Sequence, residues 1–162
     1  MKRRFAILLA LCGLLSLAGC SDYSDVKINS CRVGAIDGFS LMSGQMGTSV
    51  RLFVDVDNPP PREIKVKDMT LLLYEADGDL FAEVTSRDEI LVPASYEGEI
   101  SAAMDIELKS FHPLSFMLGA KDFDNMTFDV DMRVRYGILT HRVRRDGIPV
   151  RSLINRLGSS KK

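Results

Sequence analysis

Strict alternation of apolar and polar residues over about ten positions most constrains what this chain can fold into. Two stretches show it most clearly, residues 48–57 and 126–136. Successive side chains of a β-strand point to opposite faces, so this period of two predicts strands with one buried and one solvated face. The inward residues are expected to be Val50, Leu52, Val54, Val56, Phe128, Val130, Met132 and Val134.

Weaker patterns separated by turn-forming residues predict further strands. These strands cover residues 26–33, 35–41, 63–76, 80–85, 90–93, 98–108 and 138–145. Residues 42–47 are expected to form a loop, and Asp77-Gly78 is a hairpin signal. Within 63–76 we expect one face to carry Ile64, Val66, Leu72 and Tyr74, and the run from Met69 to Tyr74 suggests burial on both sides. Two stretches favour helix: 110–118 in the body, and a short basic segment at 150–157.

Seven or eight strands with little helix predict an all-β fold. Antiparallel strands with one polar face favour an immunoglobulin- or fibronectin-III-like β-sandwich, followed here by a short C-terminal helix. We expect the sandwich to occupy residues 26–145, and the basic helix and tail to occupy residues 146–162.

The first residues of the chain have the features of a targeting segment. Lys2-Arg3-Arg4 is positively charged, and Phe5 to Gly19 is an uncharged, mostly apolar run of 15 residues. A membrane-spanning helix needs roughly 20 apolar residues, so this run is short for a permanent anchor and is typical of a secretory signal. An ordinary secretory signal and an uncleaved anchor are the alternatives to the interpretation that follows.

Leu17-Ala18-Gly19-Cys20 resembles the lipobox of bacterial lipoproteins. The resemblance implies that the signal peptide 1–19 is removed and that Cys20 becomes the first residue. It also implies that Cys20 carries at least two acyl chains such as palmitate, which is enough for stable membrane attachment. Residues 20–25 would then be the lipidated cysteine and a short tether. Ser21 follows Cys20 in place of the Asp of an inner-membrane retention signal, which favours the outer membrane, facing the periplasm.

Removal of the leader leaves few cysteines. Cys12 departs with it and Cys20 is the predicted lipid site, so Cys31 is the one other cysteine of the mature chain. We expect Cys31 to be a strand residue and not a nucleophile, and we expect no internal disulfide.

The order of motifs along the body carries a second resemblance. An alternating strand ends in Val54-Asp55-Val56-Asp57-Asn58-Pro59, and a second strand contains Ile64-Lys65-Val66 and Leu71-Leu72-Leu73-Tyr74. Asp77-Gly78 and Ile90-Leu91-Val92-Pro93 follow. Over residues 26–145 this order resembles the late-embryogenesis-abundant type 2 domain, also called the WHy domain, although Pro60 and Pro61 depart from its Asn-Pro-Asn ending. The resemblance implies a non-enzymatic β-sandwich associated with stress protection, membranes and lipid contact, and it supplies no catalytic residues.

Residues able to carry catalysis or hold a metal have structural explanations. The segment Gly38-Phe39-Ser40-Leu41-Met42 lacks the final Gly of a nucleophile elbow. His112 and His141 lack metal-ligand spacing, and after the acidic segment 122–125, Met126 and Thr127 stand where the third ligand and the Gly of a calcium loop should fall. We therefore expect no enzyme activity, no metal and no cofactor.

Charge is distributed unevenly along the chain. Residues 21–131 hold 9 basic and 21 acidic residues, whereas residues 132–162 hold 9 basic residues and 1 acidic residue. Candidates for contact with anionic lipid headgroups are Arg142, Arg144, Arg145, Arg151 and Arg156. The alternative is that these arginines keep an exposed strand and tail soluble. Nucleic acid is not an expected partner, because the body is acidic.

The sequence thus predicts a lipid-anchored protein of the cell envelope whose β-sandwich binds or supports a partner without transforming it. The expected partners are the membrane through the N-terminal lipid, and an anionic lipid or an envelope protein. The alternative function is a periplasmic lipid-binding or lipid-handling module. A deep apolar pocket between the sheets would favour lipid handling, and a solid core would favour the binding or structural role.

Overall fold

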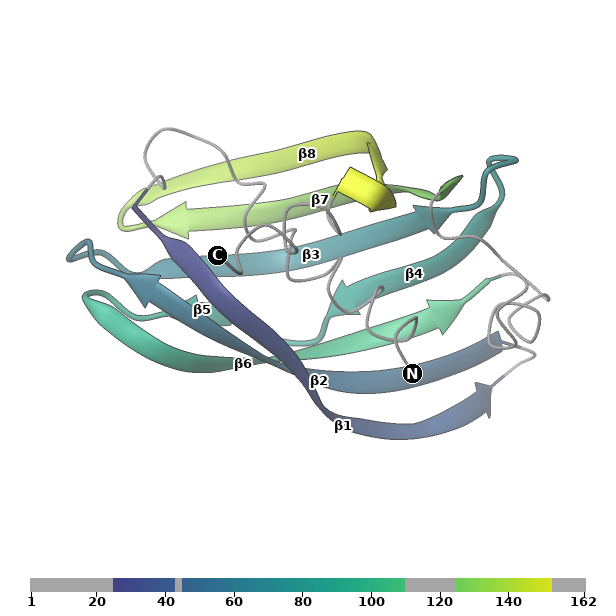
Figure 1. Ribbon diagram of the computed structural model, residues 1–162, viewed down its shortest axis with the longest axis horizontal. Helices are drawn as coiled ribbons and strands as arrows, with labels where there is room; N and C mark the ends of the chain where they lie inside the picture. Colours follow the sequence, from purple (N-terminus) through teal and green to yellow (C-terminus); the bar gives the residue numbers. More distant parts are fainter. Residues whose placement is uncertain (1–24, 43–44, 110–124, 153–162) are drawn as a thin grey trace.

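Eight β-strands make up most of the described structure (Figure 1). The computed structural model describes residues 25–42, 45–109 and 125–152. The strands are β1 (Lys27–Met42), β2 (Gln45–Asn58), β3 (Ile64–Tyr74), β4 (Leu80–Ser86), β5 (Ile90–Val92), β6 (Tyr96–Leu108), β7 (Thr127–Tyr136) and β8 (Leu139–Pro149). All their pairings are antiparallel. The predicted all-β class and strand number are confirmed.

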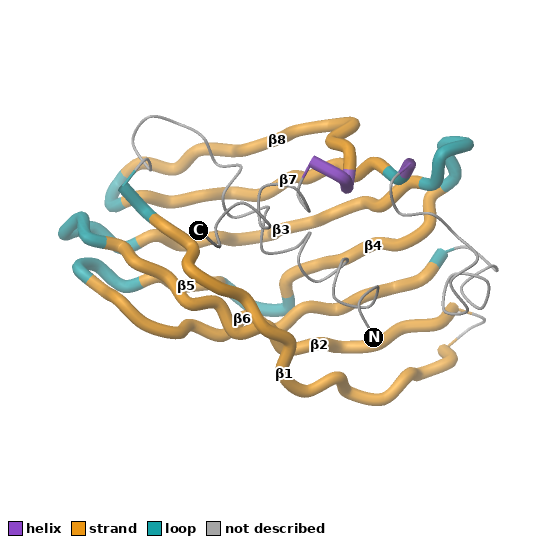
Figure 2. Tube along the Cα trace, viewed as in Figure 1, coloured by secondary structure: helices purple, strands orange, loops and turns teal. Residues whose placement is uncertain are grey.

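The strands form one open sheet in the order β1-β2-β6-β4-β3-β7-β8, and β5 pairs separately with β3. β4 is the bridge, since it pairs with β3 only over Thr70–Tyr74 and with β6 only over Met104–Leu108. Figure 2 shows the strands of the open sheet in this order. We call β1-β2-β6 and β3-β7-β8, on either side of the bridge, its two layers, because buried side chains of both belong to one hydrophobic core. This arrangement is consistent with the expected β-sandwich.

The inward side chains of both layers form one hydrophobic cluster. The alternation predicted for β2 and β7 is confirmed, since every inward residue expected there is at most 3% exposed. In β6, Ala102 and Met104 are buried, and Ile100, Ile106 and Leu108 pack half-buried against the cluster. The sequence pattern therefore identified the inward residues of β2 and β7 correctly.

The predicted inward face of β3 is wrong beyond its first four residues. Asp68 adopts a positive φ of 50°, and the register with β7 shifts between Lys67 and Thr70. Such a bulge adds one residue and reverses the side on which each later side chain lies. The buried residues of β3 are consequently Ile64, Val66, Met69, Leu71 and Leu73, whereas Leu72 and Tyr74 lie on the outer face.

The first hairpin also differs from prediction. Residues 26–33 and 35–41, expected as two strands, belong to the single strand β1, and β2 begins at Gln45 inside the expected loop. The register of β1 with β2 shifts at three places, so the glycines bend the strand without ending it. At Gly34 a Cβ atom would lie 2.3 Å from the ring of Phe53, which explains the need for glycine at that bend.

The last strand continues to Pro149, four residues beyond the predicted end. A bulge opposite Asp129 accommodates Asp146-Gly147, where Gly147 has a φ of 65° and its N–H donates to Asp129 Oδ1 at 2.7 Å. Val150 is 1% exposed and begins a helical turn over residues 150–152, where a helix was expected. The remainder of that helix and the helix predicted at 110–118 lie outside the described residues.

Candidate functional site

The β-sandwich has two distinct ends, and the pairing register assigns the loops to them. Lys27 pairs with Asp57 at one end, where Ile64 also pairs with Tyr136. The start of β1, the β2–β3 loop, the β5–β6 turn and the β7–β8 turn therefore share this end (Figure 1). We call it the tethered end, because the chain reaches β1 from Cys20 here. Cys20 itself lies outside the described residues.

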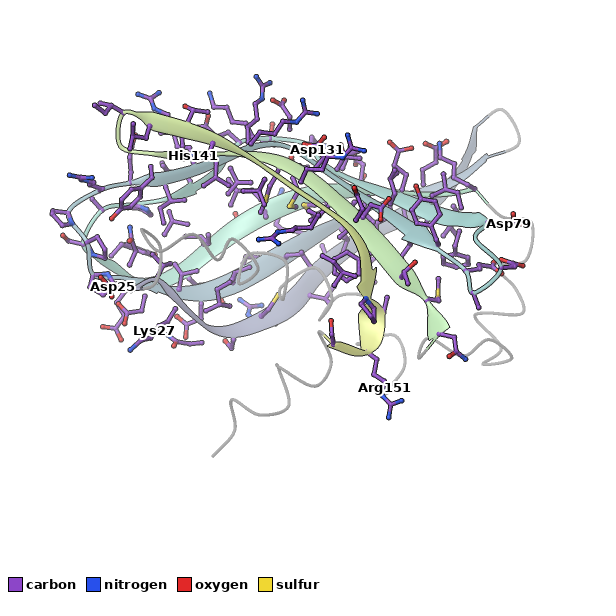
Figure 3. The ribbon with its side chains drawn as sticks, turned by 90° about the horizontal axis from the view of Figure 1, so that it is seen from above. Asp25, Lys27, Asp79, Asp131, His141 and Arg151 are labelled. Atoms are coloured by element: carbon purple, nitrogen blue, oxygen red, sulfur yellow. The ribbon has the colours of Figure 1, made fainter. Side chains whose placement is uncertain are left out.

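The segment between Cys20 and the start of β1 is short. Five residues separate Cys20 from Val26, which packs half-buried against the core. At roughly 3.3–3.6 Å per residue, this segment spans at most about 20 Å when extended. Any attachment at Cys20 therefore holds the tethered end closest to the attachment point. Asp25 and Lys27 are labelled at this end in Figure 3, and Asp79 lies at the opposite end.

Asn58 fixes the β2–β3 loop at the tethered end. Its side chain is completely buried, and Nδ2 donates to the carbonyl oxygens of Arg62 at 3.0 Å and of Pro93 at 2.7 Å. The N–H of Ser95 also donates to the carbonyl of Pro60 at 2.9 Å. This is the Asn-Pro position singled out in the sequence, and its role here is to join two loops.

The predicted arginines do not gather at one point. Arg142 donates to Asp131 from Nε at 2.9 Å and from Nη2 at 2.5 Å, and Arg144 donates to Asp146 at 3.4 Å. The hydrogen bond from Arg142 holds the pKa of Asp131 below its usual range, and Asp131 raises the pKa of Arg142 in turn. These two arginines are thus partly neutralised by neighbours in the fold.

The other three predicted arginines are placed differently. Arg145 pairs with Val130, so it lies on the inner side of the exposed strand β8. Arg151 is exposed in the helical turn after β8, beyond Pro149, which pairs with Thr127 (Figure 3). At about 3.4 Å per residue, Thr127 lies roughly 30 Å along β7 from Tyr136. Arg151 is therefore at the end opposite the tether, and Arg156 lies outside the described residues.

A different basic surface lies near the tethered end. A surface groove of about 330 Å³ is lined by Lys67, Arg133, Arg135 and Thr140, on the outer faces of β3, β7 and β8. Lys67 pairs with Glu89 at 2.6 Å and Arg133 pairs with Asp68. The Nε of Arg135 donates to the carbonyl of Gly137 at 2.9 Å. We call this feature the hairpin groove.

The β7–β8 turn beside this groove carries two exposed apolar side chains. Ile138 is 92% exposed and Leu139 is 49% exposed. Arg62 lies 5.6 Å from the ring centre of Tyr136 at the base of the turn, within cation–π range. We call Ile138 and Leu139 the apolar tip. Sequence analysis did not single out the tip or the groove, although an isoleucine next to the turn glycine was a visible signal.

Two further charge networks cover the outer faces of β2, β4 and β6. Arg87 contacts Asp105 and Ser49 at 2.6 Å, and the hydrogen bond from Arg87 is the main cause of the lowered pKa of Asp105. Lys109 bridges Glu107 and Glu83, and its pKa is raised chiefly by Glu107. Each of these carboxylates is paired with a cation. Such paired charges are typical of a solvent-exposed sheet surface.

The positions considered for catalysis or metal binding are scattered. No group of three or more His, Cys, Asp or Glu side chains able to hold a metal occurs among the described residues. Ser40 belongs to β1, and His141 is exposed on β8. His112, Asp122 and Asp124 fall outside the described part of the chain. Within that part, no helix is long and apolar enough to cross a membrane.

Cys31 is a strand residue as expected, but it is disulfide-bonded, so the prediction of no internal disulfide is wrong. The other cysteines of the chain, Cys12 and Cys20, lie outside the described residues. Pairing of cysteines is decided in three dimensions, which spacing along the sequence does not reveal. A sulfur atom that carries a thioether-linked lipid cannot also form a disulfide. With Cys12 removed in the leader and Cys20 lipidated, neither cysteine can form a disulfide with Cys31, so this disulfide and the predicted mature lipoprotein exclude each other in one molecule.

Comparison with known proteins gives few matches. No family model and no curated protein matches the chain. Among solved structures, a crystal structure of a protein from Archaeoglobus fulgidus is 8% identical, with a TM-score of 0.41, covering 74% of this chain and 97% of that one. The Northeast Structural Genomics Consortium target SoR45 is 7% identical, with a TM-score of 0.38, covering 74% of this chain and 81% of its own.

Proposed function

We propose that this chain is a lipid-anchored lipoprotein of the cell envelope, attached through Cys20 and sorted to the outer membrane facing the periplasm. Its β-sandwich would be a non-enzymatic module that binds or supports a partner. The observation that carries the proposal is Leu17-Ala18-Gly19-Cys20 at the end of a short, positively headed apolar run. The immediate start of β1 at Lys27 supports it, because a folded domain directly follows a short tether.

The packing of the sandwich supports a binding or structural role over lipid handling. Buried side chains from both layers form one hydrophobic core, among which Leu71, Met104 and Phe128 are 0% exposed. The hairpin groove and a second groove over β3, β7 and β8 are lined largely by charged side chains, and a third groove over β2, β4 and β6 is lined by polar and charged side chains with Ile106. A module that carries lipid between its sheets needs an apolar cavity of several hundred Å³. Native mass spectrometry distinguishes the two roles, since lipid handling requires bound lipid to leave with the folded protein.

Replacing the attachment residue tests the anchor. Cys20→Ser should move the protein from the membrane fraction to the soluble fraction, because no acyl chain can be attached to serine in its place. Each buried CH₂ of the lipid contributes about 0.8 kcal/mol, so the absence of two acyl chains should release nearly all of the protein from the membrane. Cys12→Ser is the matched control, since it changes a cysteine within the proposed leader and should leave the protein membrane-bound. Full membrane retention of Cys20→Ser would refute the anchor.

A further inference from the structure

The apolar tip is not required by the turn that presents it. Tyr136 pairs with Leu139, so Gly137 and Ile138 form a two-residue loop. Gly137 has a φ of 61°, as the first central position of such a turn demands. The second position is ordinarily polar in tight hairpins. Ile138 at 92% exposure therefore gains nothing from the fold and exposes an aliphatic side chain to solvent.

The position of the tip gives this exposure a meaning. The tip lies at the tethered end, at the level of Ile64 in β3 and with the start of β1 at the same end. In Figures 1 and 3 the β7–β8 turn and the start of β1 both lie at the left end of the long axis. A lipid at Cys20 thus brings this part of the sandwich closest to a bilayer.

The spacing between the tip and the hairpin groove matches the layering of a membrane surface. The headgroup layer on each side of a bilayer is roughly 5–7 Å thick. Arg135 and Thr140 pair one residue inward from the tip, about 3.4 Å along the strand, and Arg133 is about 10 Å from Tyr136. With the tip at the hydrocarbon boundary, the first pair lies within the headgroups and the backbone of Arg133 lies about 3 Å or more beyond them.

The excess of positive charge on this side of the molecule favours contact with an anionic membrane surface. The groove and its surroundings hold five cations and three carboxylates, an excess of two positive charges. These residues are Arg62, Lys65, Lys67, Arg133, Arg135, Glu63, Asp68 and Glu89. The other layer presents Asp57 and Glu97 at the same end. The β3-β7-β8 side would therefore face the bilayer, and the β1-β2-β6 side would tilt away.

From these observations we infer that the tethered end docks on the bilayer. The apolar tip enters the interface, and the hairpin groove binds the phosphate of an anionic lipid. The inference rests on the proposed function and extends it, since it assigns an orientation and a lipid-binding surface to the anchored domain. It differs from contact along the basic C-terminal segment, because it assigns the lipid-binding surface to Lys67, Arg133 and Arg135. Lys67 and Arg133 are ion-paired with Glu89 and Asp68, just as Arg142 and Arg144 are paired with Asp131 and Asp146, so position near the tip and not lack of pairing distinguishes the two surfaces.

The absence of tryptophan from the chain makes a direct test possible. Ile138→Trp introduces a single tryptophan at the tip, and Ile36→Trp is the control at another exposed isoleucine, 58% exposed on β1. Each full-length protein is reconstituted into vesicles of equal parts phosphatidylcholine and phosphatidylglycerol, or of phosphatidylcholine alone, with acyl-chain bromine as the quencher. Tryptophan at position 138 should shift to the blue and be quenched on the anionic vesicles, and tryptophan at position 36 should do neither.

Charge variants in the Ile138→Trp background then locate the binding surface. Arg133→Gln and Arg135→Gln should each weaken docking about five-fold, the effect of one charge near an anionic surface, and Arg145→Gln should change it little. An equal loss with Arg145→Gln would overturn the groove as the binding surface. Tight calorimetric binding of soluble glycerol phosphate, without tryptophan quenching on vesicles, would identify a free phosphate as occupant and overturn the bilayer.

Flotation separates failure of this inference from failure of the anchor. Protein that floats with the vesicles while its tip tryptophan stays unquenched would refute docking and leave the lipid anchor intact. Protein that does not float with either vesicle would refute both. Flotation on both vesicle types with quenching only on the anionic one is the result that supports docking.

Discussion

Apolar residues occur at both ends of the β7–β8 hairpin, but they are exposed at the turn and buried at the far end. At the turn end, Ile138 and Leu139 are exposed, and the Nε of Arg135 donates to the backbone carbonyl of Gly137. At the far end, Phe128 and Val150 are at most 1% exposed and belong to the hydrophobic core. The comparison teaches that an apolar residue in this hairpin is buried only where it belongs to the shared core, and that the sequence of the hairpin alone does not decide this.

Truncation of one apolar residue at each end tests this difference most strongly. Phe128→Ala removes a ring that is 0% exposed and should lower the free energy of unfolding by about 3–5 kcal/mol. Ile138→Ala removes a solvated side chain and should change it by less than about 0.5 kcal/mol. Urea unfolding of both variants measures the contrast. Similar losses for the two would show that the tip packs against something in the folded protein.

Much of this fold follows from the sequence because period-two alternation is a local property. β2 and β7 were predicted with the correct inward faces, since neither contains a bulge within its alternating core residues. β3 was not, because the positive φ at Asp68 shifts its register and no glycine or proline marks the place. The disulfide at Cys31 and the meeting of Asn58 with Pro93 also depend on contacts between distant segments, which no local pattern encodes.

The surfaces were harder to predict than the core. The arginine candidates came from net charge along the chain, which ignores the carboxylates of the neighbouring strand. Asp131 neutralises Arg142 across the β7–β8 ladder, whereas Lys67, Arg133 and Arg135 come together from two strands far apart in the sequence. Either arrangement can be predicted only when the pairing register of the antiparallel strands is known.

The second prediction concerns the loops of the tethered end. Asn58→Ala removes a fully buried amide and leaves the carbonyls of Arg62 and Pro93 without this donor. The expected cost is about 1–3 kcal/mol in thermal or urea unfolding. Asn125→Ala, at an exposed position before β7, is the control and should have little effect. A neutral Asn58→Ala would mean that the two loops are held together by other contacts.

The smallest effect on stability is expected from the ion pair between Asp131 and Arg142 in the β7–β8 hairpin. The folded-state pKa of Asp131 is lowered chiefly by the hydrogen bond from Arg142. Its contribution to stability should therefore be complete above the ordinary Asp range and disappear as the pH falls through the lower folded value. Carboxyl titration by NMR should show a lowered pKa for Asp131 that returns toward the ordinary value in Arg142→Gln. An unchanged pKa in that variant would contradict the pairing.

Attachment through Cys20 underlies both the function and the orientation proposed for this protein, and the mass of the mature N-terminal peptide tests it most directly. We expect membrane-extracted protein to yield a peptide that begins at Cys20 and carries the mass of at least two acyl chains. An unmodified Cys20, in a peptide that retains the leader or is disulfide-linked to the Cys31 peptide, would contradict the account.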